Sequence, residues 1–401
     1  MRLLFLSDNF PPEVNAPASR TYEHCLEWVK QGVDVTVITC FPNFPRGEVF
    51  SGYKNKLYQK ETINGIRVIR VWSYIAANSG FSRRISDFVS YALMAFLFGI
   101  LQRFDVVIGT SPQFFTAVSA RFLGCARRKP WVMEVRDLWP ESIAAVGTMR
   151  RSSKVYRFLE IIERQLYRSS KAIVVNAEGL KTSIEKKGIL QEKIKVIKNG
   201  VMLSDYGVVV KDKFLLKKLN LEEKFIVSYI GTMGMAHALD FILDCANEIT
   251  DKKIHFIMIG EGAERENLMH KAKNLKLDNV TFLSGVPKEE VKNYIGISNV
   301  SLVNLKKSDT FKKIIPSKIF ENVALKKPIL LGVEGESKAL IQKYQVGICY
   351  EPENKKSFYD ALNEIANLDN QQLSDNCDLM IKNFDRSKLA REMLDFIKIN
   401  I

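Results

Sequence analysis

The chain contains the stretch Pro316-Ser317-Lys318-Ile319-Phe320-Glu321, followed by Lys327-Pro328 and the apolar run Ile329-Leu330-Leu331. Pro316 is well placed to open a helix, because its fixed φ suits the first turn and its missing N–H has no partner there anyway. Lys318 and Glu321 stand three residues apart, so both side chains project from nearly the same face. Since the helix leads directly into an apolar strand, the stretch predicts a helix–strand unit of an α/β sheet.

This helix start suits a ligand that carries both hydroxyls and phosphates. The free N–H groups and the dipole at a helix N-terminus favour an anion, and Lys318 adds a full positive charge. A carboxylate such as Glu321 only accepts hydrogen bonds, which fits a pair of ribose hydroxyls. In isolation the motif equally fits an amphipathic helix with a surface Lys–Glu pair. The other segments of the chain favour a nucleotide-sugar site.

Length and charge limit the possible classes of protein. A chain of 401 residues fits two domains of about 200 residues each. The formal net charge of +14 lies mainly in the first half, where residues 1–200 hold 30 Lys and Arg against 17 Asp and Glu. Such a field attracts nucleic acid, anionic lipid or a phosphorylated substrate. Nucleic acid is the weakest of these, because the cations are scattered and no nucleic-acid-binding motif accompanies them.

An uncharged stretch at 88–101 follows Arg83 and Arg84 and precedes Arg103. It is too short to span a bilayer, which needs about 20 apolar residues. It therefore fits either a buried helix or a helix that lies at a membrane surface.

The sequence indicates neither export nor a metal site. The apolar run at 3–6 has the length of a strand and is followed by Ser7 and Asp8, so we expect no signal peptide and a cytoplasmic chain. Six cysteines and four histidines are dispersed without pairs at metal-ligand spacing. We therefore expect no disulfide framework and no bound metal.

Short apolar segments alternate with helical ones along the chain. Strands are predicted at 3–7, 33–39, 66–72, 106–109, 131–135, 172–176, 195–197, 225–229, 254–259, 280–283, 300–304, 328–331 and 347–350. This alternation indicates parallel sheets covered by helices on both faces. It restarts after a polar segment at 204–221, which we interpret as a linker.

The expected fold is therefore α/β, with two Rossmann-like doubly wound domains. The first covers residues 1–204, rejoined by a C-terminal helix at 385–401, and the second covers residues 205–384. Ligands of such sheets bind beyond the carboxyl ends of the strands. This rule predicts an active site in a cleft between the domains.

Loops after the strands supply further candidates. The loop at 7–20, before a helix expected near Thr21, is longer than the usual 2–6 residues or so and favours substrate binding. In the loop after Tyr229, Gly231 and Gly234 permit positive φ and an open backbone that cradles phosphate. His237 in this loop either donates to a phosphate or caps a helix.

Two further turns contain Gly260 and Gly262, and Ser284 to Val286. Their backbone groups either read the edge of a nucleobase or form plain strand-to-helix turns.

Taken together, these segments resemble the family 4 retaining glycosyltransferases, which have the two-domain GT-B fold. The likeness covers nearly the whole chain and rests on Pro11-Pro12-Glu13, Gly32 to Thr39, Asn199-Gly200-Val201, the Gly231 loop, Gly260 to Gly262, Ser284 to Val286, and the Glu321 helix with Lys327-Pro328. The segment 137–141, Asp-Leu-Trp-Pro-Glu, is similar to a subgroup that acts in bacterial O-antigen, capsule and lipid-linked polysaccharide synthesis. The stretch PSKIFE fits the same subgroup.

The chain departs from the family pattern at several positions. Lys313 stands where the family often has the first of two glutamates, and Arg136 stands where it often has a histidine. Thr232 and His237 replace the usual Arg and Lys of the phosphate loop. Other cations must then meet the phosphate charge, and Lys318 is the first candidate.

The resemblance implies retaining transfer of a sugar, an N-acetylated amino sugar from a UDP donor, without a metal or other cofactor. The implied catalytic residues are Lys318, Glu321 and Asp137. The implied donor-binding residues are Gly231, Thr232, Gly234, His237, Gly260, Gly262, Val286, Ser317, Lys318 and Glu321. The implied acceptor-binding residues are Asn15, Ala16, Arg136, Asp137 and Glu141.

The implied partners are a UDP-sugar, a polyprenyl-diphosphate-linked or glycan acceptor and the inner face of the membrane, where the chain would bind peripherally, but no nucleic acid. Two alternatives stay open. A UDP-sugar epimerase of GT-B architecture would need no acceptor. An inactive protein that binds sugar nucleotides or lipids would account for the missing glutamate and phosphate-loop cations.

Overall fold

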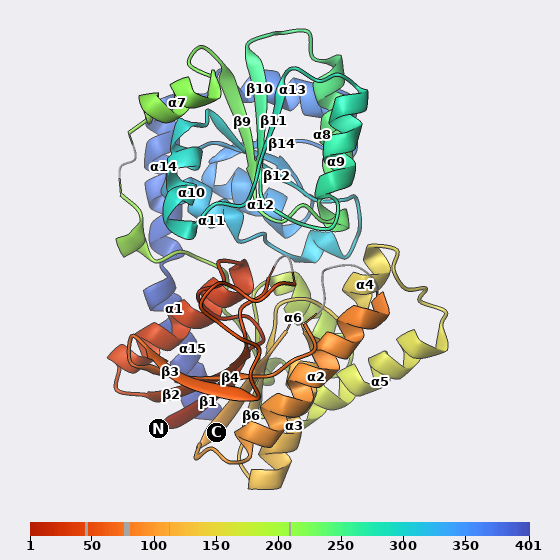
Figure 1. Cartoon of the computed structure of the whole chain (residues 1–401), viewed down its shortest axis with the longest axis vertical. Coiled ribbons are helices and arrows are strands. Elements are labelled where there is room, and N and C mark those ends of the chain that lie inside the picture. The colour runs from red at the N-terminus through yellow and green to blue at the C-terminus, as the bar shows by residue number, and fades with distance from the viewer. Residues whose placement is uncertain (45–46, 76–80, 112, 208–209) are drawn as a thin grey trace. The chain divides into compact units, whose positions relative to one another are not determined.

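The computed structural model describes residues 1–44, 47–75, 81–111, 113–207 and 210–401, with the side chains of 81 and 82 excepted. The chain forms two compact units (Figure 1). Unit 1 comprises Met1–Lys198 and Arg386–Ile401, and unit 2 comprises Asn199–Asp385. The junction lies before Asn199 rather than at residue 204, because Asn199 Nδ2 donates to Ile315 O and Val201 N donates to Phe384 O, both within unit 2.

Unit 1 is built on one sheet. Its strands are β1 (Arg2–Leu6), β2 (Asp34–Cys40), β3 (Tyr58–Ile63), β4 (Ile66–Val71), β5 (Val106–Thr110), β6 (Trp131–Val135), β7 (Ala172–Val175) and β8 (Ile194–Val196). Its helices are α1 (Ala16–Lys30), α2 (Phe81–Gly99), α3 (Phe114–Arg127), α4 (Glu141–Ala145), α5 (Lys154–Ser169), α6 (Glu178–Glu185) and α15 (Arg386–Asn400). Within the described residues the strand order is β3-β4-β2-β1-β5-β6-β7-β8.

Strand β3 was not predicted. It pairs with β4 antiparallel at the edge of the sheet, whereas the other strand pairs of unit 1 are parallel among the described residues. Its side chains alternate between exposed and half-buried, so it lacks the continuous apolar run of a strand that is buried on both faces.

Helices cover both faces of this sheet. On one face α1 packs against α15, and Trp28 Nε1 donates to Ala390 O over 2.8 Å. On the other face α3 lies close to β5, because an added Cβ on Gly109 would meet the Ala120 Cβ at 2.7 Å. Helix α2 packs beside α3, and α5 contacts α3 in turn. The layer formed by α2, α3 and α5 can be followed in Figure 1.

The uncharged stretch at 88–101 forms most of α2. Phe88, Tyr91 and Ala95 are buried, whereas Leu93 and Leu97 are more than half exposed. The helix is therefore packed on the unit through one face and exposes an apolar stripe on the other. Among the described residues, no helix has both the length and the apolarity that crossing a membrane requires.

Unit 2 contains a second sheet. Its strands are β9 (Phe225–Ile230), β10 (Ile254–Ile259), β11 (Val280–Leu283), β12 (Val300–Asn304), β13 (Ile329–Gly332) and β14 (Gly347–Cys349). Its helices are α7 (Lys213–Leu219), α8 (Leu239–Glu248), α9 (Arg265–Asn274), α10 (Lys288–Ile297), α11 (Lys318–Ala324), α12 (Glu336–Tyr344), α13 (Lys355–Ile365) and α14 (Asn370–Asn383). The strand order among the described residues is β11-β10-β9-β12-β13-β14, with parallel pairing.

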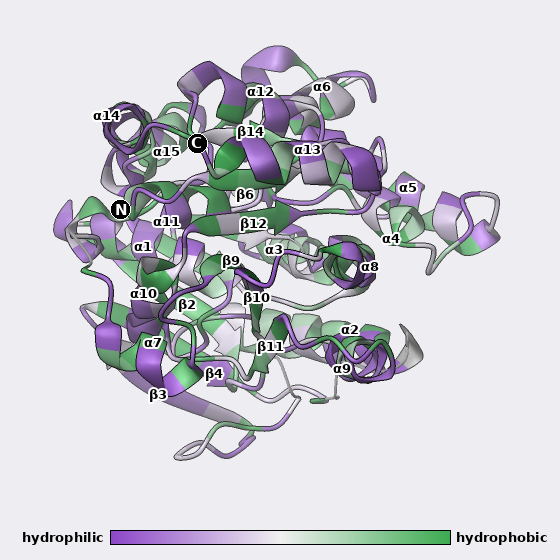
Figure 2. Ribbon diagram, turned by 90° about the horizontal axis from the view of Figure 1, so that it is seen from above, coloured by the Kyte–Doolittle hydropathy of each residue, from purple (hydrophilic) through white to green (hydrophobic). Residues whose placement is uncertain are grey.

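The apolar runs predicted these strands because both faces of the sheet are covered. Strand β12 is green in the hydropathy view of Figure 2, whereas helices of the same unit such as α13 and α14 carry purple residues. The predicted linker at 204–221 is only partly a linker. Its second half forms α7, and Leu216 and Leu221 pack in an apolar cluster with Ile226 of β9.

Candidate functional site

The loop after β9 is pressed against the loop after β10. Gly231 N donates to Ile259 O, and Met233 N donates to Glu261 O, so the parallel pairing continues past the strand ends. Gly260 has φ +144°, and an added Cβ there would lie 1.9 Å from Gly231 O. Gly262 has φ +154°, and its Cβ would lie 2.3 Å from Met233 O. Glycine is required at both positions by this close backbone contact.

Replacing Gly260 by alanine is expected to destabilise the chain by on the order of 1–3 kcal/mol, because the new side chain meets backbone and φ stays in a strained region. Gly234→Ala is the matched control. Gly234 has φ −119°, so it does not use the positive φ that glycine permits, and the nearest atom to its added Cβ is 3.9 Å away. Thermal unfolding checks the pair, and equal melting temperatures would show that the loop yields at little cost.

Lys318 lies directly beside this glycine loop. Its Nζ would be 2.8 Å from a Cβ on Gly231, and it lies 3.8 Å from the centroid of the Tyr229 ring. Burial lowers the pKa of Lys318 to about 7, while the charge of Glu321 acts in the opposite direction. The structure thus brings the predicted cation to the predicted loop, in a place where it is poorly solvated and gains from an added negative charge.

His237 lies next to this lysine. Its ring centroid is 5.9 Å from that of Tyr229, and burial, with the charge of Lys318, lowers the pKa of His237 to about 3. The imidazole is therefore neutral at neutral pH. Its Nδ1 is buried and has no hydrogen-bond partner among the described residues.

Asn304 at the end of β12 fixes the turn that carries His237. Its Nδ2 donates to His237 O and Ala238 O, and its Oδ1 accepts from Tyr350 Oη over 2.7 Å. Asn304 and Tyr350 were missed in the sequence. A polar residue at the carboxyl end of a buried strand is the signal that could have identified Asn304.

The stretch 316–321, with which the sequence analysis began, leads into the short helix α11 (Lys318–Ala324). Ile319 N donates to Pro316 O and Phe320 N donates to Ser317 O, so the first turn starts at the proline, as predicted. Lys318 and Glu321 are half-buried on this turn. Lys327 has a different role, because its Nζ donates to Gly296 O and Ser298 O over 2.7 and 2.8 Å. It ties α10 to the start of β13.

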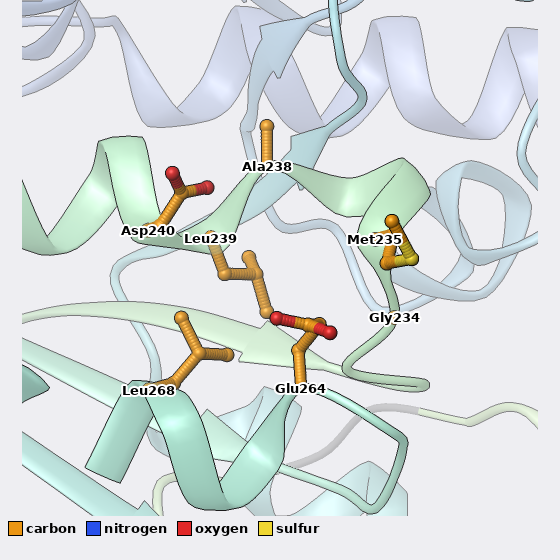
Figure 3. Close-up of a pocket in the computed structure, with 7 residues that line it drawn as sticks. All are labelled: Gly234, Met235, Ala238, Leu239, Asp240, Glu264 and Leu268. Carbon is orange, nitrogen blue, oxygen red and sulfur yellow. The ribbon is translucent and has the colours of Figure 1, made fainter. Parts of the chain in front are cut away.

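A cavity of about 210 Å³ lies on the α8 and α9 side of the glycine loop (Figure 3). Its lining consists of Gly234, Met235, Ala238, Leu239, Asp240, Glu264 and Leu268. Of the predicted donor residues it includes Gly234 alone. Ser317, Lys318 and Glu321 do not line it, so the cavity meets the predicted diphosphate site at Gly234 and does not include its cation.

In unit 1, the loop after β1 is shorter than expected. Helix α1 begins at Ala16 rather than near Thr21, because Asn15 caps it by accepting from Ala18 N over 2.8 Å. The carbonyls of Ala16 and Pro17 accept from the Arg136 guanidinium over 3.0 and 3.2 Å. Three of the predicted acceptor residues are thus neighbours, and Arg136 orders the start of α1.

A buried ion pair lies next to this contact. Arg20 Nε lies 2.8 Å from Glu134 Oε1, and both side chains are 1% exposed. Arg20 also donates to Ile197 O and Lys198 O, and Thr110 Oγ1 donates to Glu134 Oε2. The pair links α1, β6 and the end of β8, and neither residue was singled out in the sequence.

The other predicted acceptor residues follow β6. Arg136 N and Asp137 N donate to Ser111 Oγ, and burial raises the pKa of Asp137. Glu141 begins α4, and its Oε1 lies 3.9 Å from Arg151 Nη2.

Asp8, at the end of β1, is a carboxylate that the sequence interpretation missed. It accepts from the side chains of Asn9 and Gln113, and burial raises the pKa of Asp8 to about 6. Unit 1 therefore presents Asp8 beyond the carboxyl end of β1, and Arg136 and Asp137 beyond that of β6, with β5 between the two strands. Within the described part of the chain, no group of three His, Cys, Asp or Glu residues is arranged to hold a metal.

The family model described as a glycosyl transferase 4-like domain matches residues 15–200, and the model described as glycosyl transferases group 1 matches residues 211–383. The chain is 23% identical over 367 residues to the putative colanic acid biosynthesis glycosyl transferase WcaI of Escherichia coli (strain K12), covering 88% of this chain and 89% of the relative. It is 24% identical over 304 residues to the probable glycosyltransferase WbjE of Pseudomonas aeruginosa, covering 72% and 74%. Among solved structures, Anabaena HepE in complex with UDP and glucose is similar with a TM-score of 0.72 at 14% identity, covering 99% of both chains.

Proposed function

Because the chain belongs to the group 1 glycosyl transferases with a glycosyl transferase 4-like N-terminal domain and the GT-B fold, we propose that it transfers a sugar from a UDP donor to a lipid-linked or polysaccharide acceptor in bacterial surface glycan synthesis. The relative named for colanic acid biosynthesis and the UDP complex of a similar structure support this proposal. We propose an N-acetylated amino sugar as the sugar that is transferred from UDP.

One observation carries the proposal for the donor side. The Lys318 ammonium lies against Gly231 and is desolvated enough that burial lowers its pKa to about 7. A half-buried, poorly solvated cation beside an open backbone loop is poised for an anion with several acceptor oxygens. We assign the diphosphate to Lys318, Ser317 and the 231–234 backbone, and the ribose hydroxyls to Glu321.

The proposed reaction breaks the bond between the anomeric carbon and the diphosphate oxygen. The acceptor oxygen forms its new bond on the same face of the sugar, and its proton passes to an oxygen of the leaving diphosphate. Lys318 and the backbone N–H groups stabilise the charge that develops on this leaving group. The proposal includes no resident metal or other cofactor.

The acceptor side is assigned to unit 1. Arg136 holds the start of α1, and Asp137 and Glu141 follow in the same connection. The positive charge of residues 1–200 suits an acceptor attached to a polyprenyl diphosphate at the cytoplasmic face of a membrane.

Thermal unfolding with UDP, GDP, ADP and dTDP tests the donor class. A ligand at 100 times its Kd adds about 2.7 kcal/mol of stability. Stabilisation by UDP alone supports the proposal, and no stabilisation by any of the four contradicts it. Incubation with UDP-sugars alone then separates transfer from epimerisation, because an epimerase forms its product without an acceptor.

Replacing Glu321 by glutamine is expected to weaken UDP binding about tenfold or more, because a hydrogen bond to a charged group contributes roughly 1.5–3 kcal/mol. Glu364→Gln, an exposed position on α13, is the control. Isothermal titration with UDP measures both variants. An affinity of the Glu321 variant equal to that of the control would remove this residue from the site.

A further inference from the structure

Helix α5 of unit 1 has two distinct faces. Tyr156, Leu159, Leu166 and Tyr167 are buried in the unit. On the opposite side Val155, Phe158 and Ile161 are each more than half exposed. This spacing of three residues places them along one outer stripe of the helix. Large apolar side chains gathered in this way mark an interaction site rather than scattered surface positions.

The neighbouring helices extend this stripe into a surface. Phe122 on α3 is 56% exposed, and Leu93 and Leu97 on α2 are also more than half exposed. Helix α3 contacts both α2 and α5, and Arg121 donates to Gln165 across the α3–α5 boundary. We call the set Leu93, Leu97, Phe122, Val155, Phe158 and Ile161 the apolar face.

Cations surround the α5 part of the apolar face. The exposed residues Arg150, Arg151, Lys154, Arg157, Arg164 and Arg168 lie on α5 or in the turn before it. The helix carries two carboxylates against them. Glu163 is buried and paired with Lys187, and Glu160 is half-buried. The exposed side of α5 is therefore both apolar and strongly positive.

The combination of apolar and cationic side chains on α5 discriminates among the partners that could bind this surface. A second copy of the same face would bring these cations close to like charges, and such a juxtaposition costs several kcal/mol. A nucleic acid would match the charge but leave the aliphatic side chains without partners. An anionic lipid surface satisfies both, because apolar groups enter the acyl boundary while cations meet the headgroups.

We propose that the apolar face and the cations of α5 dock unit 1 on an anionic lipid bilayer, with α5 lying in the plane of the interface. This inference rests on the proposed function, because docking would bring unit 1 to a lipid-linked acceptor at the surface of the bilayer. Glu141, an assigned acceptor residue, pairs with Arg151 in the turn that leads into α5. Docking of α5 thus places the acceptor side of unit 1 next to the headgroups.

Vesicle flotation of the full chain tests the proposal without a donor or an acceptor. We expect the protein to float with vesicles of phosphatidylcholine and phosphatidylglycerol, to stay unbound with phosphatidylcholine alone, and to dissociate as salt is raised. The double variant Phe158→Ser, Ile161→Ser should lose binding about tenfold or more. The triple variant Arg157→Gln, Arg164→Gln, Arg168→Gln should lose roughly fivefold for each cation removed.

The matched controls lie on α7 of unit 2, which also combines exposed apolar and cationic residues. Phe214→Ser, and Lys213→Gln with Lys217→Gln and Lys218→Gln, should keep wild-type flotation. Equal loss in the α7 controls, or equal binding to neutral vesicles, would overturn the proposal. All variants should retain stabilisation by UDP, which shows that they are folded. Loss of flotation with UDP binding intact, or the reverse, separates the docking surface from the donor site.

Discussion

Replacing Lys318 by methionine is expected to reduce the rate of sugar transfer by about 100- to 1,000-fold, the usual effect of removing one preorganised donor to a developing negative charge. Lys318 Nζ lies at the Gly231 backbone and over the Tyr229 ring, so the cation is held in place before the substrate arrives. Methionine keeps most of the apolar stem but has no charge. Steady-state kinetics with a UDP-sugar measures the effect.

The matched control is Lys338→Met, at an exposed position on α12. It removes the same charge from the same unit and should retain wild-type turnover. Lys318→Arg is a second comparison, because its larger planar head has to fit between Gly231 and the Tyr229 ring. A Lys318→Met variant that turns over as fast as Lys338→Met would place the phosphate charge elsewhere.

The same substitution, Lys318→Met, is expected to raise the stability of the folded chain although it lowers the rate of sugar transfer. Burial lowers the pKa of Lys318 from its ordinary value of 10.5 to about 7, so the unfolded chain binds more protons between these two values. The stability of the wild-type chain should therefore rise with pH over that window. Methionine removes the poorly solvated charge, so the variant should gain most stability relative to wild type near pH 7 and less at higher pH. Thermal unfolding at both ends of the window checks the sign.

The strands of both sheets could largely be predicted because burial on two faces demands continuous apolar runs. The edge strand β3 was not predicted. Its residues 58–63 include Gln59, Lys60 and Glu61 and lack a continuous apolar run, so the segment resembles a surface loop. The start of α1 was misplaced for a different reason. Pro17 suggested a loop, although proline near the first turn of a helix is well tolerated, and Asn15 provided the cap.

The residues of the candidate site could also be predicted only where the signal was local in the sequence. Gly231, Gly260 and Gly262 were found from their spacing after strands, which is local information. The reason for them was not found, because it lies in contacts between residues of two loops that are 28 or 29 positions apart in the chain. Spacing also gave Lys318 and Glu321 but could not show that Lys318 lies over Tyr229. Arg136 was found as a departure from a family pattern, while its partners Ala16 and Pro17 are known only from the fold.

The buried pair of Arg20 and Glu134 lies 114 positions apart in the chain, and the structure predicts a large effect there too. Arg20→Met is expected to lower the free energy of unfolding of unit 1 by about 3–5 kcal/mol, because Glu134 is left buried without its hydrogen-bonded ion-pair partner. Adding Glu134→Gln should recover part of this loss, since the uncompensated charge is then gone. All four tryptophans, Trp28, Trp72, Trp131 and Trp139, belong to unit 1, so tryptophan fluorescence in urea reports on this unit specifically.

Arg2 offers a matched control for Arg20, because Arg2 Nη2 lies 2.8 Å from Asp105 Oδ1 in the same unit, yet the two side chains are 45% and 36% exposed. Water solvates either charge after its partner is removed, so Arg2→Met should leave the urea midpoint close to that of wild type. The two pairs share the same ion-pair distance and differ in burial. A midpoint for Arg20→Met as high as that for Arg2→Met would mean that Glu134 takes up a proton or a water when its partner is lost, and that Ile197 and Lys198 are held by other contacts.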